Sequence, residues 1–319
     1  MPEHGSTVEM HILNLVTNPN AQFFQQQVTA LERRGITGET LAVPGERLTT
    51  DTGTSSRSIV DYLRFYPRVL RESRGSYDLV HANYGLTAPA ALAQPRRPVV
   101  LSLWGSDLFG EFGWLSRWCA KRADAVIVMT DEMAEELDTP ATVIPHGVDL
   151  NLFRPIPQDA ARELVGWRDD AAHVLFPYSK QRPVKDYPRA ESVVSGVRER
   201  RDADVVLQTL HDVPHARMPL YMNAADALLL TSKHEGSPNV VKEAMACNLP
   251  VVSTDVGDVG DRLEPVSRSF VRRTDEALID ALCDVLEQGD RSGARRHVED
   301  IGVDRMSKRI GSVYASVSR

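Results

Sequence analysis

Two glutamates, Glu235 and Glu243, stand eight positions apart on either side of a short loop that opens a predicted helix. A carboxylate accepts hydrogen bonds from paired hydroxyls, so each of these glutamates could hold a diol. On a helical path their separation is on the order of 10 Å, from a rise of about 1.5 Å per residue. That separation is close to the span between two sugar rings joined by a diphosphate.

The loop between the two glutamates is suited to the diphosphate itself. Gly236 supplies a turn, Ser237 is the predicted N-cap, and Pro238 suits the first helical position because it lacks an N–H. The unpaired N–H groups of such a loop and the positive end of the helix dipole favour phosphate. The residues assigned to this contact are Gly236, Ser237, Pro238, Asn239 and Val240.

The neighbouring elements hold this loop in place. Residues 227–231 form an apolar run typical of a strand buried on both faces, and residues 251–254 are the next strand. Asn248 can adopt the left-handed conformation after the helix, and Pro250 prevents the helix from continuing. Strand, loop, helix and strand in this order make up a unit of an open parallel α/β sheet. Such sheets bind ligands beyond the carboxyl ends of their strands.

Glu235-x₇-Glu243, followed by Ala-Met-Ala and Pro-Val-Val, resembles the donor-binding signature of the family 4 glycosyltransferases. The resemblance covers nearly the whole chain and is most specific over residues 176–259. It implies the GT-B fold, in which two Rossmann-like domains face each other across a cleft with their parallel sheets. It also implies that Glu235 contacts hydroxyls of the transferred sugar as a catalytic residue, and that Glu243 holds the ribose of the nucleotide.

The resemblance gives the chain three segments. Residues 1–155 are expected to form an N-terminal, acceptor-side Rossmann-like domain, and residues 156–303 a C-terminal domain that binds the nucleotide sugar. Residues 304–319 are expected to form a helix that returns to the first domain. The run Arg-Pro-Ile-Pro at 154–157 is the expected linker.

A basic stretch opens the second domain and suits a diphosphate. The family places an arginine there and a lysine five residues later, both on the donor diphosphate. This chain has Lys180 where the arginine usually stands, keeps Lys185, and carries Arg182 between them. Lysine holds phosphate as a point charge without the bidentate fork of arginine. The family also places the 211–215 loop near the nucleobase, which implies His211 and Val213 at the base of a UDP- or GDP-linked donor.

Two strands of the first domain, predicted at 77–82 and 98–103, end in polar loops where an acceptor is expected. The acceptor-side candidates are His81, Asn83, Tyr84, Trp104 and Gly105, with Asp107 as a further catalytic carboxylate. The family usually has His-Gly-x-Asp at the second loop, and Trp104 occupies the position of that histidine. No catalytic histidine is therefore transferred. Trp104 could stack on a sugar, or could be a half-buried aromatic residue at a strand end.

Length, charge and composition narrow the kinds of protein that this chain can be. A chain of 319 residues suits two domains, and a net charge of −7 argues against general nucleic-acid binding. The three cysteines fall in no pair or metal spacing, no apolar run approaches the length of a membrane span, and the first residues lack the pattern of a signal peptide. These features predict a cytoplasmic protein. No G-x-G-x-x-G is present, which disfavours a dinucleotide dehydrogenase.

Membrane contact is left open by two segments. Residues 57–74 predict a helix with Ile59, Leu63, Tyr66 and Leu70 on one face and arginines on another, which is the pattern of a helix that docks on anionic lipid. An ordinary surface helix with solvated arginines is the alternative. The aromatic stretch at 109–118 could be an acceptor platform, a membrane-facing lip or a lid packed on its own domain. Peripheral contact with the cytoplasmic membrane face would follow from a lipid-docking helix or a membrane-facing lip, and would suit a lipid-linked acceptor.

The function expected from the resemblance is transfer of a hexose-type sugar from a nucleoside diphosphate sugar to a hydroxyl of a glycan, lipid or small molecule, with retention of anomeric configuration. Lys180, Lys185 and the loop amides would stabilise the leaving diphosphate, so neither a metal nor a cofactor is expected. Asp-Ala-Asp at 202–204 matches a metal-binding motif by letter, but it precedes a strand instead of following one. Two alternatives remain, namely a non-catalytic protein that binds nucleotide sugars and an epimerase or hydrolase of the same fold.

Overall fold

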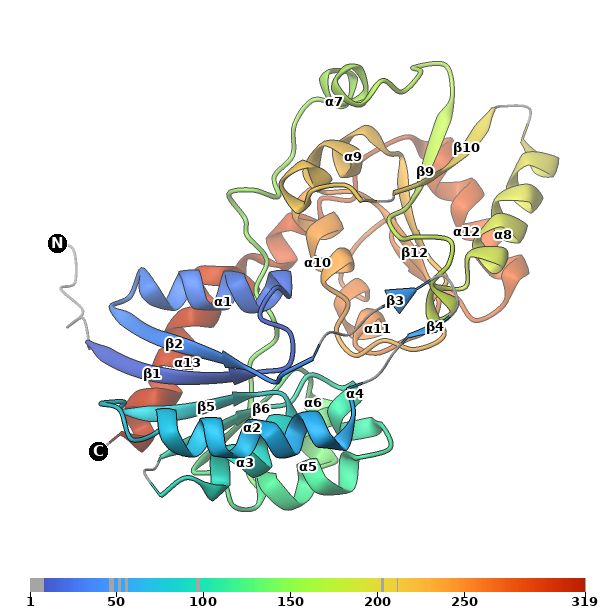
Figure 1. Cartoon of the computed structure of the whole chain (residues 1–319). Coiled ribbons are helices and arrows are strands. Elements are labelled where there is room, and N and C mark those ends of the chain that lie inside the picture. Colours follow the sequence, from blue (N-terminus) through green and yellow to red (C-terminus); the bar gives the residue numbers. More distant parts are fainter. Residues whose placement is uncertain are drawn as a thin grey trace, which may run out of the picture. The chain divides into compact units, whose positions relative to one another are not determined.

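Two parallel sheets, one in each of two units, organise the chain (Figure 1). The computed structural model describes residues 9–45, 49–50, 53–54, 57–95, 98–201, 204–210 and 212–318. Unit 1 comprises Met1–Gly147 together with Val303–Arg319, and unit 2 comprises Val148–Gly302. Each unit is an α/β structure with its own hydrophobic core.

Unit 1 is built on six parallel strands in the order β2-β1-β5-β6-β7-β8. These strands are β1 (Met10–Val16), β2 (Ile36–Ala42), β5 (Leu79–Asn83), β6 (Val99–Ser102), β7 (Ala125–Val128) and β8 (Thr142–Val143). Its helices are α1 (Gln22–Glu32), α2 (Ile59–Glu72), α3 (Ala88–Ala93), α4 (Ser106–Phe109), α5 (Gly113–Ala120), α6 (Asp131–Glu135) and α13 (Val303–Val317), with a 3-10 turn η1 (Gly85–Thr87). Helix α13 packs against α1, and α3 packs between α2 and α5 (Figure 1). Two short strands, β3 (Thr49–Thr50) and β4 (Gly53–Thr54), pair separately.

Unit 2 is built on five parallel strands in the order β10-β9-β11-β12-β13. These strands are β9 (Ala172–Phe176), β10 (Val205–Thr209), β11 (Ala227–Leu230), β12 (Val251–Ser253) and β13 (Phe270–Val271). Its helices are α7 (Gln158–Val165), α8 (Tyr187–Arg200), α9 (Met218–Ala224), α10 (Asn239–Ala246), α11 (Val259–Leu263) and α12 (Asp275–Gln288). Short 3-10 turns are η2 (Pro183–Lys185), η3 (His215–Arg217), η4 (Ala294–His297) and η5 (Glu299–Ile301).

Strand β11 lies at the centre of the unit 2 sheet and is fully buried, as its unbroken apolar run predicts. Apolar residues of α10, among them Val241 and Met245, cover one face of the sheet. Residues of α8 and α12, among them Val193 and Leu282, cover the other. The loop after β11 is thus anchored by a strand that is packed on both faces.

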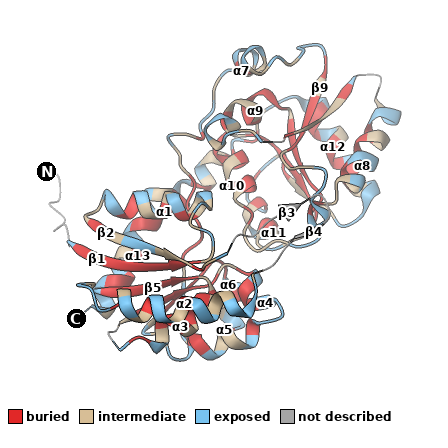
Figure 2. Cartoon of the chain, in the orientation of Figure 1, coloured by how far each residue is buried: buried red, intermediate tan, exposed pale blue. Residues whose placement is uncertain are grey.

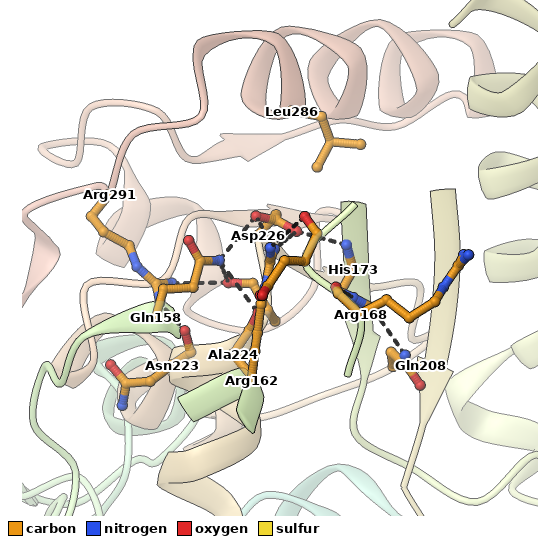
Figure 3. A network of polar contacts seen from close by, with 12 residues as sticks. Gln158, Arg162, Arg168, His173, Gln208, Asn223, Ala224, Asp226, Leu286 and Arg291 are labelled. Carbon is orange, nitrogen blue, oxygen red and sulfur yellow. Dashed lines mark hydrogen bonds and ion pairs between the residues drawn. The ribbon is translucent and has the colours of Figure 1, made fainter. Parts of the chain in front are cut away.

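The amino end of β11 is fixed by a polar network around Asp226 (Figure 3). Oδ1 of Asp226 accepts hydrogen bonds from Gln158 Nε2 at 2.9 Å and Arg162 Nη2 at 2.9 Å. Oδ2 accepts from the same Arg162 nitrogen at 2.8 Å and from the backbone N–H of His173 at 2.6 Å. The network therefore joins α7, β9 and β11 at the end of the sheet opposite to the glutamate loop.

The change from unit 1 to unit 2 falls between Gly147 and Val148, earlier than residue 155, where the proline-rich run suggested it. The backbone N–H of Val148 donates to Ile301 O, and Phe153 is completely buried in the unit 2 core. Arg295 donates to the carbonyls of Leu150 and Phe153. These contacts tie 148–153, which precede the proline-rich run, to unit 2.

Helix α2 exposes part of the apolar face that the sequence predicts. Its buried side chains are Phe65 and Val69, whereas Ile59 and Leu63 on that face are 75% and 63% exposed. A capping box between Ser58 and Asp61 begins the helix. Three apolar side chains near the start of the helix, Ile59, Val60 and Leu63, therefore face solvent.

Candidate functional site

The glutamate loop of unit 2 brings Glu235 into an ion pair with Lys185. The side chain of Lys185 is 7% exposed and that of Glu235 is 13% exposed, so both charges are largely removed from water. Burial lowers the pKa of Lys185, and the carboxylate of Glu235 opposes that shift. Two residues assigned from the sequence to the sugar and the diphosphate are therefore adjacent.

Backbone contacts hold Lys185 at this place. The hydroxyl of Thr231, at the end of β11, donates to Lys185 O at 3.0 Å. The backbone N–H of Lys233 donates to Val184 O at 2.9 Å. The turn η2 is thus fastened to the carboxyl end of β11, which puts the lysine ammonium beside the loop that carries Glu235.

Tyr178 lies at the centre of this cluster and was not assigned from the sequence. Lys185 Nζ is 4.0 Å from the centroid of its ring, and the guanidinium carbon of Arg182 is 5.4 Å from it. Burial raises the pKa of Tyr178 well above its ordinary value of 10, with a further rise from the charges of Glu235 and Glu243 and an opposing effect of Arg182. The two cations therefore share one ring, and Lys185 links that ring to Glu235.

Glu243 lies on α10 and is hydrogen-bonded to His215, with 2.8 Å between Oε1 and Nε2. His215 begins η3, and its ring centroid is 5.1 Å from that of Phe153. The sequence assigned the 211–215 loop to the nucleotide but did not pair His215 with Glu243. His211 itself, and Asp202 of the Asp-Ala-Asp motif, lie outside the described residues.

A hollow of about 220 Å³ opens beside Tyr178. Its walls are Pro177, Tyr178, Ser179, Arg182, Leu210, Asp212, Val213 and Met218. Val213, predicted beside the nucleobase, is thus in the wall of the same hollow as Tyr178. The walls thus combine apolar side chains with the polar side chains of Ser179, Arg182 and Asp212, and a small molecule with both apolar and polar groups would fit such a lining.

Ser237 does not cap α10, contrary to the sequence prediction; the N-cap residue is Pro238, which has no capping side chain. The Ser237 hydroxyl donates instead to Asp258 Oδ2 at 2.8 Å, and Lys242 Nζ donates to that hydroxyl at 3.3 Å. Arg262 completes the cluster through a bond of its Nε to Asp258 Oδ2 at 2.6 Å. The N–H groups in the first turn of α10 are therefore not capped by the side chain of the N-cap residue.

The cluster behind the loop contains a buried lysine. Lys242 is 1% exposed, and burial, with a smaller effect of Arg262, lowers its pKa to about 7 against opposing effects of Asp258 and Glu243. Gly257, with φ of +53°, approaches the loop so closely that a Cβ there would lie 2.0 Å from Gly236 O. The loop that carries Asp258 is thus packed directly on the glutamate loop, an arrangement that the sequence does not reveal.

Lys180 is placed apart from this cluster. Its side chain is exposed, and its Nζ lies 4.6 Å from the ring centroid of Tyr187. Arg182, named from the sequence only as a neighbour, is the cation that shares Tyr178 with Lys185. The geometry therefore favours Arg182 over Lys180 as the second cation of the site.

In unit 1, Asp107 is buried and organises the strand-end loops. Its carboxylate accepts hydrogen bonds from the backbone N–H groups of Gly85 at 2.8 Å, Trp104 at 2.8 Å and Gly105 at 2.9 Å. Burial raises its pKa to about 6, and these hydrogen bonds oppose the rise. The carboxylate points at the backbone, so its visible role is to position the two loops.

The same loops gather aromatic residues. The Trp104 ring centroid lies 4.6 Å from that of Phe23, 5.7 Å from that of Tyr84 and 5.8 Å from that of His146. Tyr84 has φ of 147°, a strained value for a residue with a side chain. Trp104 is thus half-buried in an aromatic cluster at the carboxyl end of β6, to which the sequence did not assign Phe23 and His146.

His81 and Asn83, predicted on the acceptor side, lie in the core. His81 is fully buried between Tyr314 Oη, 2.7 Å from Nδ1, and Ser102 Oγ, 2.8 Å from Nε2, and burial lowers its pKa to about 3. Asn83 is bonded to Gln27 and Asn14 at 2.9 and 3.0 Å. Neither side chain reaches the surface, because partners distant in the sequence enclose both.

Comparisons with known proteins agree with this architecture. The profile of Glycosyltransferase Family 4 matches residues 8–152, and that of Glycosyl transferases group 1 matches residues 185–288. A lipopolysaccharide core biosynthesis mannosyltransferase, LpsB of Rhizobium meliloti, is 27% identical over 65% of this chain and 69% of its own. A putative teichuronic acid biosynthesis glycosyltransferase, TuaC of Bacillus subtilis, is 27% identical over 64% of this chain and 60% of its own.

Solved structures share the fold across almost the whole chain. Sucrose-phosphate synthase from Thermosynechococcus elongatus superposes with a TM-score of 0.75 at 16% identity, over 96% of this chain and 98% of that one. HepE from Anabaena, in complex with UDP and glucose, gives 0.70 at 18% identity, over 96% and 100%. The fold is therefore that of the GT-B glycosyltransferases, as predicted. The chain belongs to the family 4 glycosyltransferases.

Proposed function

We propose that this glycosyltransferase takes a hexose-type sugar from a nucleoside diphosphate sugar bound in unit 2 and transfers it, with retention, to a hydroxyl acceptor. The observation that carries the proposal is that Lys185 and Arg182 both lie against the ring of Tyr178 while Lys185 is paired with Glu235, at the loop that leads into the helix of Glu243. A sugar, a diphosphate and a ribose need carboxylates at both ends and positive charge between them. This cluster supplies these groups at the carboxyl end of one parallel sheet.

Lys185 and Arg182 neutralise the diphosphate in this proposal. Charge on the leaving group grows as the bond between the sugar and the phosphate breaks, and a cation held in place beforehand stabilises that charge. The N–H groups at the start of α10 add to this effect through the helix dipole. Glu235, held by Lys185, accepts hydrogen bonds from sugar hydroxyls and fixes the sugar against the diphosphate.

Glu243 and His215 bind the ribose, and the hollow beside Tyr178 and Val213 takes the base. With His215 on one carboxylate oxygen, Glu243 keeps accepting capacity for a ribose hydroxyl. HepE was solved with UDP and glucose, which supports a uridine donor for this chain as the first to try.

Retention requires that the acceptor oxygen attack the face from which the diphosphate leaves, or that a carboxylate form a covalent intermediate. Glu235 and Glu243, the two carboxylates assigned to the donor, are engaged with Lys185 and His215. We therefore favour front-face attack, in which an oxygen of the departing phosphate takes the proton of the acceptor hydroxyl. Among the described residues, no three His, Cys, Asp or Glu side chains gather as metal ligands, and the two cations supply the positive charge.

The test uses water as the acceptor, so that it can be done without knowing the natural acceptor. The protein is incubated with UDP-, GDP- and ADP-hexoses, release of the nucleoside diphosphate is followed, and the released sugar is examined by proton NMR before it mutarotates. The proposal predicts one preferred base, release of the anomer present in the donor, and unchanged rate with EDTA. Release of the opposite anomer, or dependence on a divalent metal, would contradict it. Binding without any turnover, with acceptor extracts added, would favour a non-catalytic binding protein.

A further inference from the structure

Seven large apolar side chains at one end of unit 1 are exposed to solvent. Those on α2 are Ile59, Val60 and Leu63, and those on α4, α5 and their connection are Phe109, Phe112, Trp114 and Trp118. Trp114 is 62% exposed and Ile59 is 75% exposed. Only two other large apolar side chains are exposed in the described residues, Leu164 and Val184, and both belong to unit 2. We call these seven residues the apolar surface of unit 1.

The two parts of this surface lie close together in the fold. Helix α3 packs against both α2 and α5, and the three helices run along one face of the sheet (Figure 1). Pale blue marks the outward sides of α2 and α5 in Figure 2. Each helix of a parallel α/β unit starts where the preceding strand ends. The first turns of α2 and the start of α4 therefore lie at the carboxyl edge of the sheet, beside Trp104 and Tyr84.

The backbone is shaped to present the aromatic residues. Gly113 begins α5 so close to α4 that a Cβ there would lie 1.9 Å from Leu108 O. This close approach holds the α4–α5 connection as a tight turn, with Phe112 and Trp114 on its solvent side. The core contacts of the segment are made by Leu108, Ser116 and Cys119 instead.

Positive charge accompanies the apolar residues. Arg64, Arg68 and Arg71 are exposed on α2, and among the described residues no carboxylate forms an ion pair with Arg64 or Arg68. The guanidinium carbon of Arg122 lies 3.9 Å from the ring centroid of Trp118. Three acidic residues nearby already have partners. Asp61 accepts hydrogen bonds from Ser58, Glu136 pairs with Arg117, and Asp138 pairs with Lys121. Glu111 is the exposed carboxylate left within the aromatic stretch.

We propose that the apolar surface of unit 1 docks on an anionic lipid bilayer. Exposed apolar residues beside arginines fit the boundary of lipid headgroups and acyl chains, where tryptophan rings also partition. A soluble protein partner would not require arginine around the patch, whereas the anionic headgroups of a bilayer do. No described helix is both long and apolar enough to cross a membrane, so the contact is peripheral.

Docking at this edge also specifies the acceptor. The carboxyl ends of β5 and β6 lie next to the apolar surface, so the lipid surface presents its hydroxyl-bearing molecules there. Resting on the proposed function, we infer that the acceptor is a glycolipid or a lipid-linked saccharide.

The test is binding of the full chain to vesicles of phosphatidylcholine with phosphatidylglycerol, compared with phosphatidylcholine alone, by flotation at low and high salt. Lipids brominated in the acyl chain report insertion by quenching tryptophan. We expect at least roughly tenfold tighter binding to the anionic vesicles, weakened by salt. Three double variants should each reduce binding by about tenfold or more. They are Ile59→Ser with Leu63→Ser, Phe112→Ser with Trp114→Ser, and Arg64→Glu with Arg68→Glu.

Two variants serve as matched controls. Leu164→Ser removes a similarly exposed leucine (61%) from unit 2, and Lys308→Glu reverses an exposed charge on α13; neither should change vesicle binding. Thermal melts establish that all variants fold, since the altered side chains face solvent. Absence of vesicle binding, or equal binding by the surface variants and wild type, overturns the proposal. So does self-association in sedimentation velocity that Ile59→Ser with Leu63→Ser abolishes, which would assign the surface to a second copy.

Nucleotide titrations of the same samples separate this proposal from the proposed function. A protein that binds a nucleoside diphosphate but no vesicle refutes docking and leaves the donor site standing. A protein that binds vesicles but no nucleotide supports docking and refutes the donor site.

Discussion

At its amino end, strand β11 follows Asp226; at its carboxyl end, it leads to Glu235. Both carboxylates are largely buried and both face a cation, yet they differ in how fully they are bonded. Asp226 accepts from Gln158, from Arg162 with both oxygens, and from the backbone of His173. Among the described residues the carboxylate of Glu235 pairs with Lys185 alone.

The difference separates a structural carboxylate from one that can take a ligand. A carboxylate whose lone pairs are filled by the protein stabilises the fold and has nothing left to offer. One held by a single cation keeps accepting capacity, at the end of the sheet where ligands bind. Substitutions at the two ends should therefore affect different measurements.

The largest effect is expected for Glu235→Gln. The amide keeps the shape but loses the charge opposite Lys185 and the stronger acceptor for sugar hydroxyls. Donor turnover should fall by about 10²–10³-fold, as for loss of one preorganised electrostatic group. Turnover and thermal melting are measured together, with Glu163→Gln on the exposed side of α7 as the control. A change in melting temperature without a change in turnover would reverse the assignment of the two ends.

Asp226→Ala should destabilise the fold and spare the site. Arg162, whose side chain is 11% exposed, would lose its carboxylate partner, and breaking a buried pair costs about 3 kcal/mol or more. Urea unfolding measures the loss of stability, and nucleotide titration at low denaturant measures the site. Weakened nucleotide binding by the folded variant would show that the amino end also serves the ligand.

Lys242→Met tests the buried cluster behind the loop. A lysine whose pKa falls to about 7 in the folded state binds fewer protons there than in the unfolded chain between pH 7 and its ordinary 10.5. The wild-type protein should therefore gain stability through that window as pH rises, and the penalty of burying the charge is fully present below pH 7. Methionine should flatten this slope and stabilise the protein by roughly 2 kcal/mol at pH 7 or below.

Melting temperatures of both proteins from pH 6 to 10 provide the measurement. Identical slopes would mean that Lys242 is not the titrating group. Because Lys242 also bonds Ser237, a several-fold loss of nucleotide affinity in the variant would assign the lysine to positioning the loop as well.

The smallest expected effect distinguishes Arg182 from Lys180. Arg182 shares Tyr178 with Lys185, whereas Lys180 lies on Tyr187. Arg182→Ala should weaken binding of the nucleoside diphosphate by about tenfold, the size of one charge-assisted contact. Lys180→Ala should change it by less than about threefold. Calorimetric titration measures both, and the reverse order would restore the assignment made from the sequence.

Local patterns predicted the elements well and the side-chain partners poorly. The apolar run before Thr231 became β11, and Asn248 has the expected positive φ of 56° after α10. Each of these features depends on neighbouring residues. Ser237 failed as a cap because Asp258, twenty-one positions away, takes its hydroxyl.

Residues at strand ends show the same limit. His81 was expected at a ligand because it lies at the carboxyl end of a strand, but Tyr314 from the last helix buries it. Ile59 and Leu63 fit an apolar helical face, yet Phe65 and Val69 form the packed side. Periodicity identifies a stripe, whereas the packing of other elements decides which stripe is covered.

The most direct test of the central claim is calorimetric titration with UDP, GDP and ADP and their hexose conjugates, performed on wild type, Glu243→Ala and the control Glu163→Ala. We expect one nucleotide to bind preferentially, Glu243→Ala to weaken its binding by about tenfold or more through loss of the ribose contact, and Glu163→Ala to bind as wild type. Failure of every nucleotide to bind the folded protein, or equal binding by Glu243→Ala, would contradict the claim that unit 2 holds the donor at this loop.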